Sequence, residues 1–321
     1  MQTHTDQIWC SETKEVNIVK EFNQFLIGQG FTPKNITPSK NFGYPQVYVF
    51  DNQTISCRFV DSVFFDDPDL WSRGTIITDN IPLTDIGNRL ITVLPEFWHI
   101  WHFDPVFVDC APTKNYNCFM NRISGDRSIV FYELIRRGIL DQGIVSYNCF
   151  HPGDQEDRSL VNYDSQYQEA ELERYKNYHE QGRNLIPYNT ITDTLEQSII
   201  DSKISLVLET YTSDSHIVFS EKLFRVLQMP RPWLLYCSPN SLYHLRQAGF
   251  DLLDDYVDHG YDSVPAHFER LNIILDQLEQ SRNYTDTDYA RFHQAADHNR
   301  NLLLKFEHAW PERLQSVKER I

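Results

Sequence analysis

The chain has 321 residues, of which 41% are hydrophobic and 13% aromatic, and its formal net charge is −16. This length is typical of two domains of about 150 residues each, and the apolar content excludes disordered and low-complexity classes. The acidic surplus repels phosphate backbones and argues against a nucleic-acid partner. No apolar run reaches the ~18 residues of a membrane span. The start of the chain is polar and the cysteines are scattered, so we expect a cytoplasmic protein with reduced thiols.

Short apolar runs bounded by turn residues characterise the first part of the chain. Runs of this kind are typical of strands. One earlier segment, 16–26, has apolar residues at helical spacing and is expected to be a helix. The strands are expected at 47–50, 55–60, 74–78 and 90–94.

From residue 117 onward, strand-like and helix-like segments alternate as far as residue 248. This alternation predicts an α/β domain with a doubly wound parallel sheet. The strands are expected at 117–120, 144–147, 204–208 and 233–237. The helices are expected at 128–140, 193–200, 220–227 and 241–248, followed by two more at 267–280 and 289–305. Ligands bind at the carboxyl ends of such strands, which directs attention to the turns 121–127, 209–221 and 238–241.

The turn after the strand 204–208 carries charged residues at positions where a ligand is expected. Glu209 ends the strand, and we expect its carboxylate to face a cleft because a buried carboxylate is costly. Ser220 can cap a helix whose first turn holds Glu221 and Lys222. A helix start with a lysine suits a phosphate, and Glu221 can accept hydrogen bonds from sugar hydroxyls. The alternative is that Glu221 is there only because the helix dipole favours it.

The turn 121–127 has two arginines, Arg122 and Arg127, on either side of a Ser-Gly pair. Two guanidinium groups so placed can bracket a diphosphate with bidentate hydrogen bonds. The alternative is a helix cap at Asp126 with both arginines in surface ion pairs.

Four segments in this part of the chain resemble the donor-binding half of GT-B glycosyltransferases, above all the fucosyltransferase and exostosin-like group. The segments are Leu206-Val-Leu-Glu-Thr-Tyr211, Phe219-Ser-Glu-Lys-Leu-Phe224, Pro232-Trp-Leu-Leu-Tyr236 and Leu245-Arg-Gln-Ala-Gly-Phe250. The resemblance covers residues 117–250. It implies an α/β fold with two Rossmann-like domains facing a cleft. The implied parts are an acceptor-side domain at 1–112, a donor-binding domain at 113–288 and C-terminal helices at 289–321 that cross back over the junction.

The resemblance also implies roles for individual residues. Glu221 would hold the donor ribose, Lys222 a donor phosphate, and Glu209 would lie near the transferred sugar as a catalytic residue. The implied donor-binding residues are Asn121, Arg122, Arg127, Tyr211, Ser220, Glu221 and Lys222. Thr210 and Tyr211 differ from the asparagine that fucosyltransferases have at this point, so the sugar and the choice between a GDP- and a UDP-linked donor stay open.

An inverting transferase also needs a base that takes the acceptor proton, and in GT-B enzymes it typically comes from the N-terminal domain. The candidates are Asp61, Asp66, Asp67, Asp79, Glu96 and Asp109. Asp67 is preferred because it follows a strand-like run, although two aspartates before Pro68 also suit an ordinary turn. His99 and His102 lack further ligands nearby for a metal site.

The expected function is therefore an inverting, metal-independent glycosyltransferase that uses a nucleotide-sugar donor and no other cofactor. Its acceptor is open. One alternative is a non-catalytic nucleotide- or carbohydrate-binding protein on the same fold. Another is an interaction protein whose acidic surface and aromatic residues contact partners.

Overall fold

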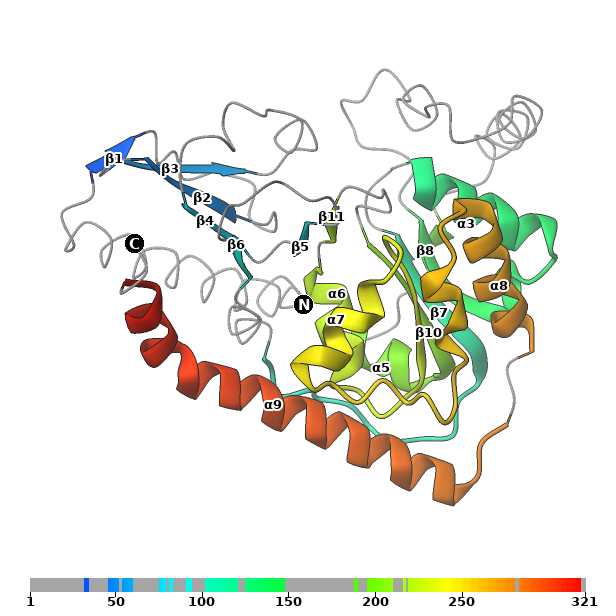
Figure 1. The fold of residues 1–321 in the computed structure, drawn as a ribbon. Helices are drawn as coiled ribbons and strands as arrows, with labels where there is room; N and C mark the ends of the chain where they lie inside the picture. Colours follow the sequence, from blue (N-terminus) through cyan, green and yellow to red (C-terminus); the bar gives the residue numbers. More distant parts are fainter. Residues whose placement is uncertain are drawn as a thin grey trace, which may run out of the picture.

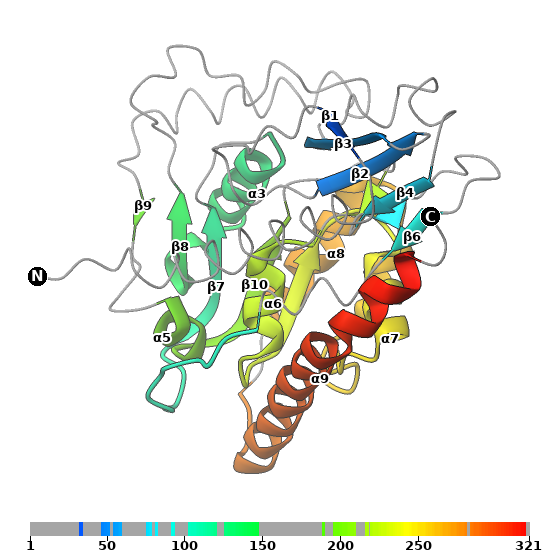
Figure 2. The same cartoon turned by 90° about the vertical axis from the view of Figure 1, so that its left-hand side faces the viewer.

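The computed structural model describes residues 102–120, 125–147, 195–209, 219–280 and 283–318, together with several short strands elsewhere. The short strands are β1 (Thr32–Lys34), β2 (Gln46–Asp51), β3 (Thr54–Phe59), β4 (Thr75–Thr78), β5 (Ile81–Pro82), β6 (Ile91–Val93), β9 (Tyr188–Asn189) and β11 (His216–Ile217). Figure 1 labels these short strands except β9, which is labelled in Figure 2. The expected helix at 16–26 lies outside the described residues.

A mainly parallel sheet forms the centre of the second part of the chain. Its strands are β7 (Lys114–Met120), β8 (Gly143–Tyr147), β10 (Ser202–Leu208) and β12 (Trp233–Tyr236), in the order β12-β10-β7-β8, with β9 antiparallel at the edge. Every residue of β12 is buried, as are all but one in β10. The predicted strands and their parallel arrangement are confirmed.

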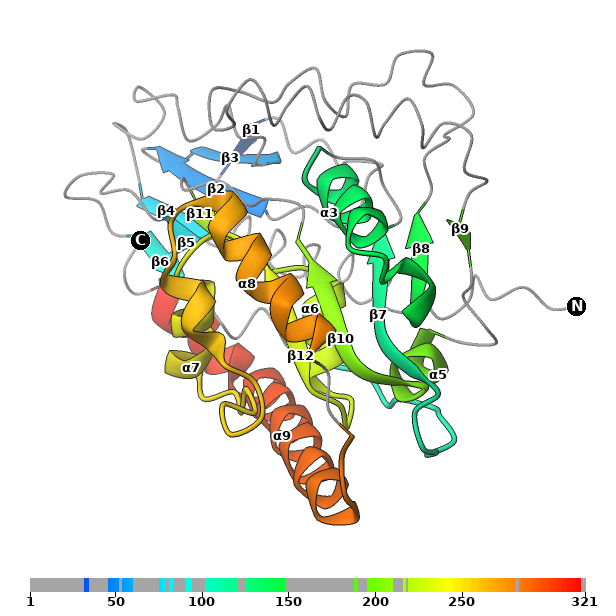
Figure 3. The same ribbon diagram turned by 90° about the vertical axis from the view of Figure 1, so that its right-hand side faces the viewer.

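Helices cover both faces of this sheet. They are α3 (Gly125–Arg136), α5 (Leu195–Ile200), α6 (Glu221–Leu227), α7 (Ser241–Ala248), α8 (His267–Glu279) and α9 (Asp286–Lys318). Figure 3 shows α3 and α8 on one face, and Figure 2 shows α5 and α6 on the other face, with α9 packed outside α6. Helices on opposite faces define a doubly wound α/β fold.

The helix expected at 128–140 is wrong at both ends. Helix α3 begins at Gly125 and ends at Arg136. It stops there because Gly138 has a φ of 68°, a left-handed conformation that closes a helix and that glycine adopts without strain. The backbone N–H of Ile139 then donates to the carbonyl of Leu134.

The first part of the chain contributes a second sheet, in the order β1-β3-β2-β4-β6. The strands β2, β3, β4 and β6 confirm the four that the sequence predicts. The sheet is mixed, since β2 is antiparallel to β3 and β4 whereas β1–β3 and β4–β6 are parallel pairs. The structure thus establishes an α/β fold, and the GT-B arrangement and its domain boundaries stay predictions.

One short antiparallel pair joins the two parts of the chain. Strand β11, in the connection from β10 to α6, pairs with β5, so that Ile217 lies opposite Ile81. The side chain of Ile217 is fully buried. The connection that follows the central strand β10 is therefore attached to the first part of the chain (Figure 1).

The C-terminal helix α9 is fixed to the parallel domain by polar and aromatic contacts. The Asn299 amide donates to the backbone carbonyls of Leu227 and Asp251, and the rings of Phe306 and Phe250 meet edge to face. Within the described part of the chain, no helix is long and apolar enough to cross a membrane.

A chain of buried hydrogen bonds provides a partner for a backbone N–H on the outer edge of β12. The Tyr261 hydroxyl accepts the backbone N–H of Leu235 at 2.9 Å and lies 3.1 Å from His259 Nδ1. His259 Nε2 lies 3.0 Å from the Leu252 carbonyl oxygen, which can only accept, so Nε2 carries the proton and Nδ1 accepts from Tyr261. Burial lowers the pKa of His259, which favours this neutral imidazole.

Removing this hydroxyl is expected to be costly. The change Tyr261→Phe leaves a buried N–H and a buried ring nitrogen without partners, and we expect the free energy of unfolding to fall by about 3 kcal/mol. Urea denaturation measures the loss. The matched control is Tyr243→Phe, which removes an exposed hydroxyl and should change stability by less than ~0.5 kcal/mol. Equal stability of the two variants would contradict the role given to Tyr261.

Candidate functional site

The candidate site lies at the carboxyl end of β10, where the topology of the sheet reverses. Strand β7 leads through α3 to β8 on one side, and β10 lies on its other side. In open α/β sheets this reversal creates the crevice in which ligands bind. Glu209 follows β10 directly, and its backbone N–H continues the ladder to the Tyr236 carbonyl at 3.1 Å.

Glu209 is buried, with only 1% of the residue exposed, so the expectation of a carboxylate facing a cleft is wrong for this structure. Oε1 accepts the backbone N–H of Ser220 at 2.9 Å, which compensates part of the cost of burial. Oε2 is also buried and has no hydrogen-bond partner among the described residues. Burial raises the pKa of Glu209, and the Lys222 ammonium and the Ser220 hydrogen bonds oppose this shift.

Ser220 is the N-cap of α6, as the sequence predicts. Its backbone is extended, and its Oγ accepts the backbone N–H of Lys222 at 3.3 Å. Because the Ser220 N–H is held by Glu209, the start of α6 is fixed to the end of β10. The two residues are eleven positions apart in the sequence.

Glu221 and Lys222 form an ion pair at the start of α6. Lys222 Nζ donates to Glu221 Oε1 at 2.8 Å, and both side chains are partly exposed. Burial works to raise the pKa of Glu221, but the charge and hydrogen bond of Lys222, a backbone hydrogen bond and the Arg225 charge together hold the pKa below its ordinary value. Exposed pairs of this kind contribute little stability, so the ammonium can exchange this carboxylate for another anion at small cost.

The remaining predicted residues fall into two groups. Arg127 lies in the first turn of α3 and is 2% exposed, so the alternative of a surface ion pair does not hold for it. Its role toward a diphosphate stays a prediction. Outside the described residues lie Asn121, Arg122, Tyr211, Asp61, Asp66, Asp67, Asp79 and Glu96.

Asp109 is the one candidate base that the structure describes, and it lies at the opposite end of the sheet. It precedes β7, and its carboxylate is 2.9 Å from His293 Nε2 and 3.5 Å from Arg231 Nη2. Its position near the amino ends of the strands separates it from the crevice at their carboxyl ends. Asp109 is therefore wrong as a base for this site.

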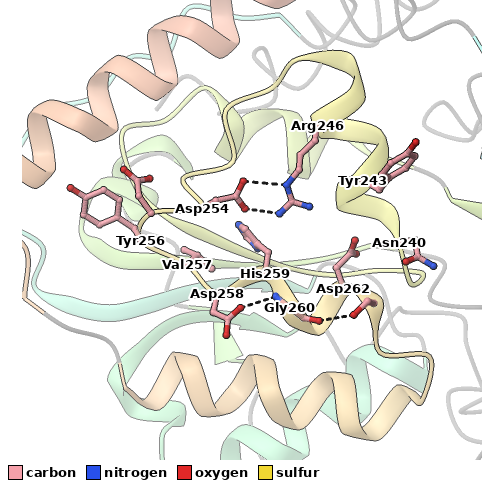
Figure 4. Close-up of a pocket in the computed structure, with 12 residues that line it drawn as sticks. Asn240, Tyr243, Arg246, Asp254, Tyr256, Val257, Asp258, His259, Gly260 and Asp262 are labelled. Carbon is pink, nitrogen blue, oxygen red and sulfur yellow. Dashed lines mark hydrogen bonds and ion pairs between the residues drawn. The ribbon is translucent and has the colours of Figure 1, made fainter.

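A second polar feature is a pocket of about 710 Å³ beside α7 (Figure 4). The sequence points to it only through the turn 238–241, which contains Asn240, and assigns no function to its other residues. The pocket is lined by the residue before α7, by residues of α7 and by the segment that follows it, including Asn240, Tyr243, Arg246, Asp254, Asp258 and Asp262. The signal that could have revealed it is the density of aspartates between residues 251 and 262.

Asp262 caps α7 from a distance. Asn240 precedes the helix with a φ of 62° and provides no side-chain cap, and Asp262 Oδ2 instead accepts the backbone N–H of Leu242 at 3.0 Å. Burial raises the pKa of Asp262 from 3.8 to about 6, although the Leu242 hydrogen bond and the Arg246 charge oppose the shift.

This shift predicts a pH dependence of stability. The folded state binds the Asp262 proton more tightly than the unfolded state, so its contribution is fully present below pH 3.8 and is lost as the pH rises through about 6. Relative to Asp262→Asn, which does not titrate and keeps an acceptor for Leu242, the wild type should lose about 2–3 kcal/mol of unfolding free energy between pH 4 and pH 7. Urea denaturation at several pH values measures this difference. A constant difference would contradict the raised pKa.

We compared the chain with protein-family models, curated proteins and solved structures, and nothing matches in any of the three. The fold class and the geometry at the end of β10 are therefore the observations from which a function is proposed.

Proposed function

We propose that the chain is a glycosyltransferase that moves a sugar from a GDP- or UDP-linked donor to an acceptor, with inversion and without a metal. One observation carries the proposal: the Glu209–Ser220 contact fixes Lys222 and Glu221 at the carboxyl end of a central parallel strand. Ligand-contacting groups are characteristic of this place in open α/β sheets. The proposed architecture is GT-B, with parts at 1–112, 113–288 and 289–321.

In this proposal Lys222 exchanges Glu221 for the donor diphosphate. The ammonium stabilises the negative charge that develops as the nucleoside diphosphate leaves. Glu221, released from the pair, accepts hydrogen bonds from the ribose hydroxyls. The exchange needs no change in the backbone, because Ser220 and Glu209 hold the start of α6 in position.

We assign Glu209 a positioning role. Because its carboxylate is buried and bonded to the Ser220 backbone, it acts on the donor through the placement of Lys222. The Lys222 ammonium also lies close enough to Glu209 to oppose the rise in the pKa of this carboxyl group.

Donor turnover tests this function. Without an acceptor, a transferase of this kind slowly releases nucleoside diphosphate by transfer to water, and release from at least one GDP- or UDP-sugar should continue in EDTA. The assay measures the released diphosphate with and without chelator. Release that depends on added Mn²⁺ or Mg²⁺ would contradict the proposed stabilisation by Lys222. Nucleotide binding without release would make the chain a non-catalytic binding protein.

A further inference from the structure

The pocket beside α7 is a second candidate binding site, on the outer flank of β12. It lies between α7 and the segment 254–263, which ends in the short helix η4 (His259–Ser263). Its volume of about 710 Å³ is within the range of small-molecule sites. Its walls are mainly polar side chains (Figure 4).

A fixed arginine lies inside this pocket. Arg246 Nε donates to Asp254 Oδ2 at 3.1 Å and Nη2 donates to Oδ1 at 2.5 Å, a bidentate pair that holds the guanidinium in one orientation. The pair raises the pKa of Arg246 and lowers that of Asp254, so both stay ionised. Among the described residues no group bonds Nη1, which leaves donors for a ligand.

Hydrogen-bond acceptors and an aromatic ring lie beside this guanidinium. Asp262 is 8% exposed, and its Oδ2 accepts the Leu242 N–H in the α7 cap. The Tyr243 backbone N–H also lies close enough to stabilise this carboxylate, whose two oxygens still have lone pairs for a ligand hydroxyl. Figure 4 shows the Asp262 carboxylate and the Asn240 amide on the same side of the pocket, with Tyr243 beside them. Tyr243 is 56% exposed, the only tyrosine among the large exposed apolar residues of the described chain.

The charges at this pocket argue against an anionic ligand. An anion would meet Asp258 and Asp262, and the guanidinium of Arg246 is already paired with Asp254. A sugar hydroxyl both donates and accepts, so neighbouring hydroxyls can bond Arg246 Nη1 and the Asp262 carboxylate together. The apolar face of a sugar ring can pack on the Tyr243 ring.

We propose that this pocket binds an uncharged saccharide. The site goes beyond the proposed transferase function, because none of its lining residues belongs to the Glu209–Lys222 site and its carboxylates repel the diphosphate that the other site would hold. Saccharide binding here does not require a donor.

The test is a titration of the full chain, without nucleotide, with maltotriose, cellotriose and triacetylchitotriose. Spermidine and inorganic phosphate serve as charged probes. Saturable binding of at least one trisaccharide is expected. The double variant Arg246→Ala, Asp254→Ala keeps the net charge and should weaken this binding at least tenfold, and Tyr243→Ala should weaken it several-fold. The matched control is Arg300→Ala, Asp297→Ala, which removes an exposed Arg–Asp pair on α9.

Three results would overturn the proposal. They are the absence of saturable binding for all three trisaccharides, tighter binding of spermidine or phosphate than of any trisaccharide, and equal saccharide affinity of the pocket and control variants. A separate titration with UDP and GDP reports on the donor site, so failure of one proposal is distinguishable from failure of the other.

Discussion

Glu209→Ala is expected to lower kcat/KM for the donor at least 100-fold and the free energy of unfolding by about 3 kcal/mol. The change removes the acceptor for the buried Ser220 N–H and leaves a cavity beside β10, and both effects are costly. The start of α6 loses its attachment, so Lys222 and Glu221 are no longer held where the donor binds. Donor-release kinetics and urea denaturation measure the two losses.

The variant Glu209→Gln distinguishes a positioning role of Glu209 from a direct role of its negative charge. The amide oxygen can accept the Ser220 N–H, so stability should stay within ~1 kcal/mol of wild type and kcat/KM within about tenfold. Rescue by glutamine supports the positioning role. A 100-fold fall in kcat at normal stability would instead show that the charge acts in the transition state.

Lys222→Ala is expected to weaken the binding of a nucleoside diphosphate about 30-fold, which corresponds to the loss of a charge-assisted hydrogen bond of about 2 kcal/mol. Stability should change little, because among the described residues this ammonium bonds only the neighbouring, partly exposed Glu221. Isothermal titration with UDP and GDP measures the affinity.

Two further variants control this experiment. Lys305→Ala removes a lysine from an exposed position on α9 and should leave the affinity unchanged, which accounts for the change in net charge. Lys222→Arg keeps the positive charge and should retain most of the binding. Equal affinities of Lys222→Ala and the wild type would remove Lys222 from the donor site.

The sequence alone predicts strand β10 and helix α6. The apolar run 204–208 predicts a strand buried on both faces, and Ser220 followed by Glu221 predicts the helix cap, because both signals are local. The burial of Glu209 depends on a hydrogen bond to a backbone group eleven residues later. No local pattern predicts that contact, and the sequence alone therefore favours an exposed carboxylate at Glu209.

Arg127 and the pocket beside α7 show the same limit. A helix expected from residue 128 begins at Gly125, which brings Arg127 into the first turn and into the interior. The pocket forms where α7 meets the segment 254–263, and Asp262 reaches the start of α7 from twenty residues away. Side-chain contacts over such separations depend on tertiary packing and not on periodicity.

The central claim is that the β10–α6 connection holds the donor diphosphate. A crystal structure of the protein with UDP or GDP tests it most directly. We expect a phosphate oxygen about 3 Å from Lys222 Nζ, ribose hydroxyls near Glu221, and Glu209 still bonded to the Ser220 backbone. A nucleotide bound elsewhere, with Lys222 still paired to Glu221, would contradict it.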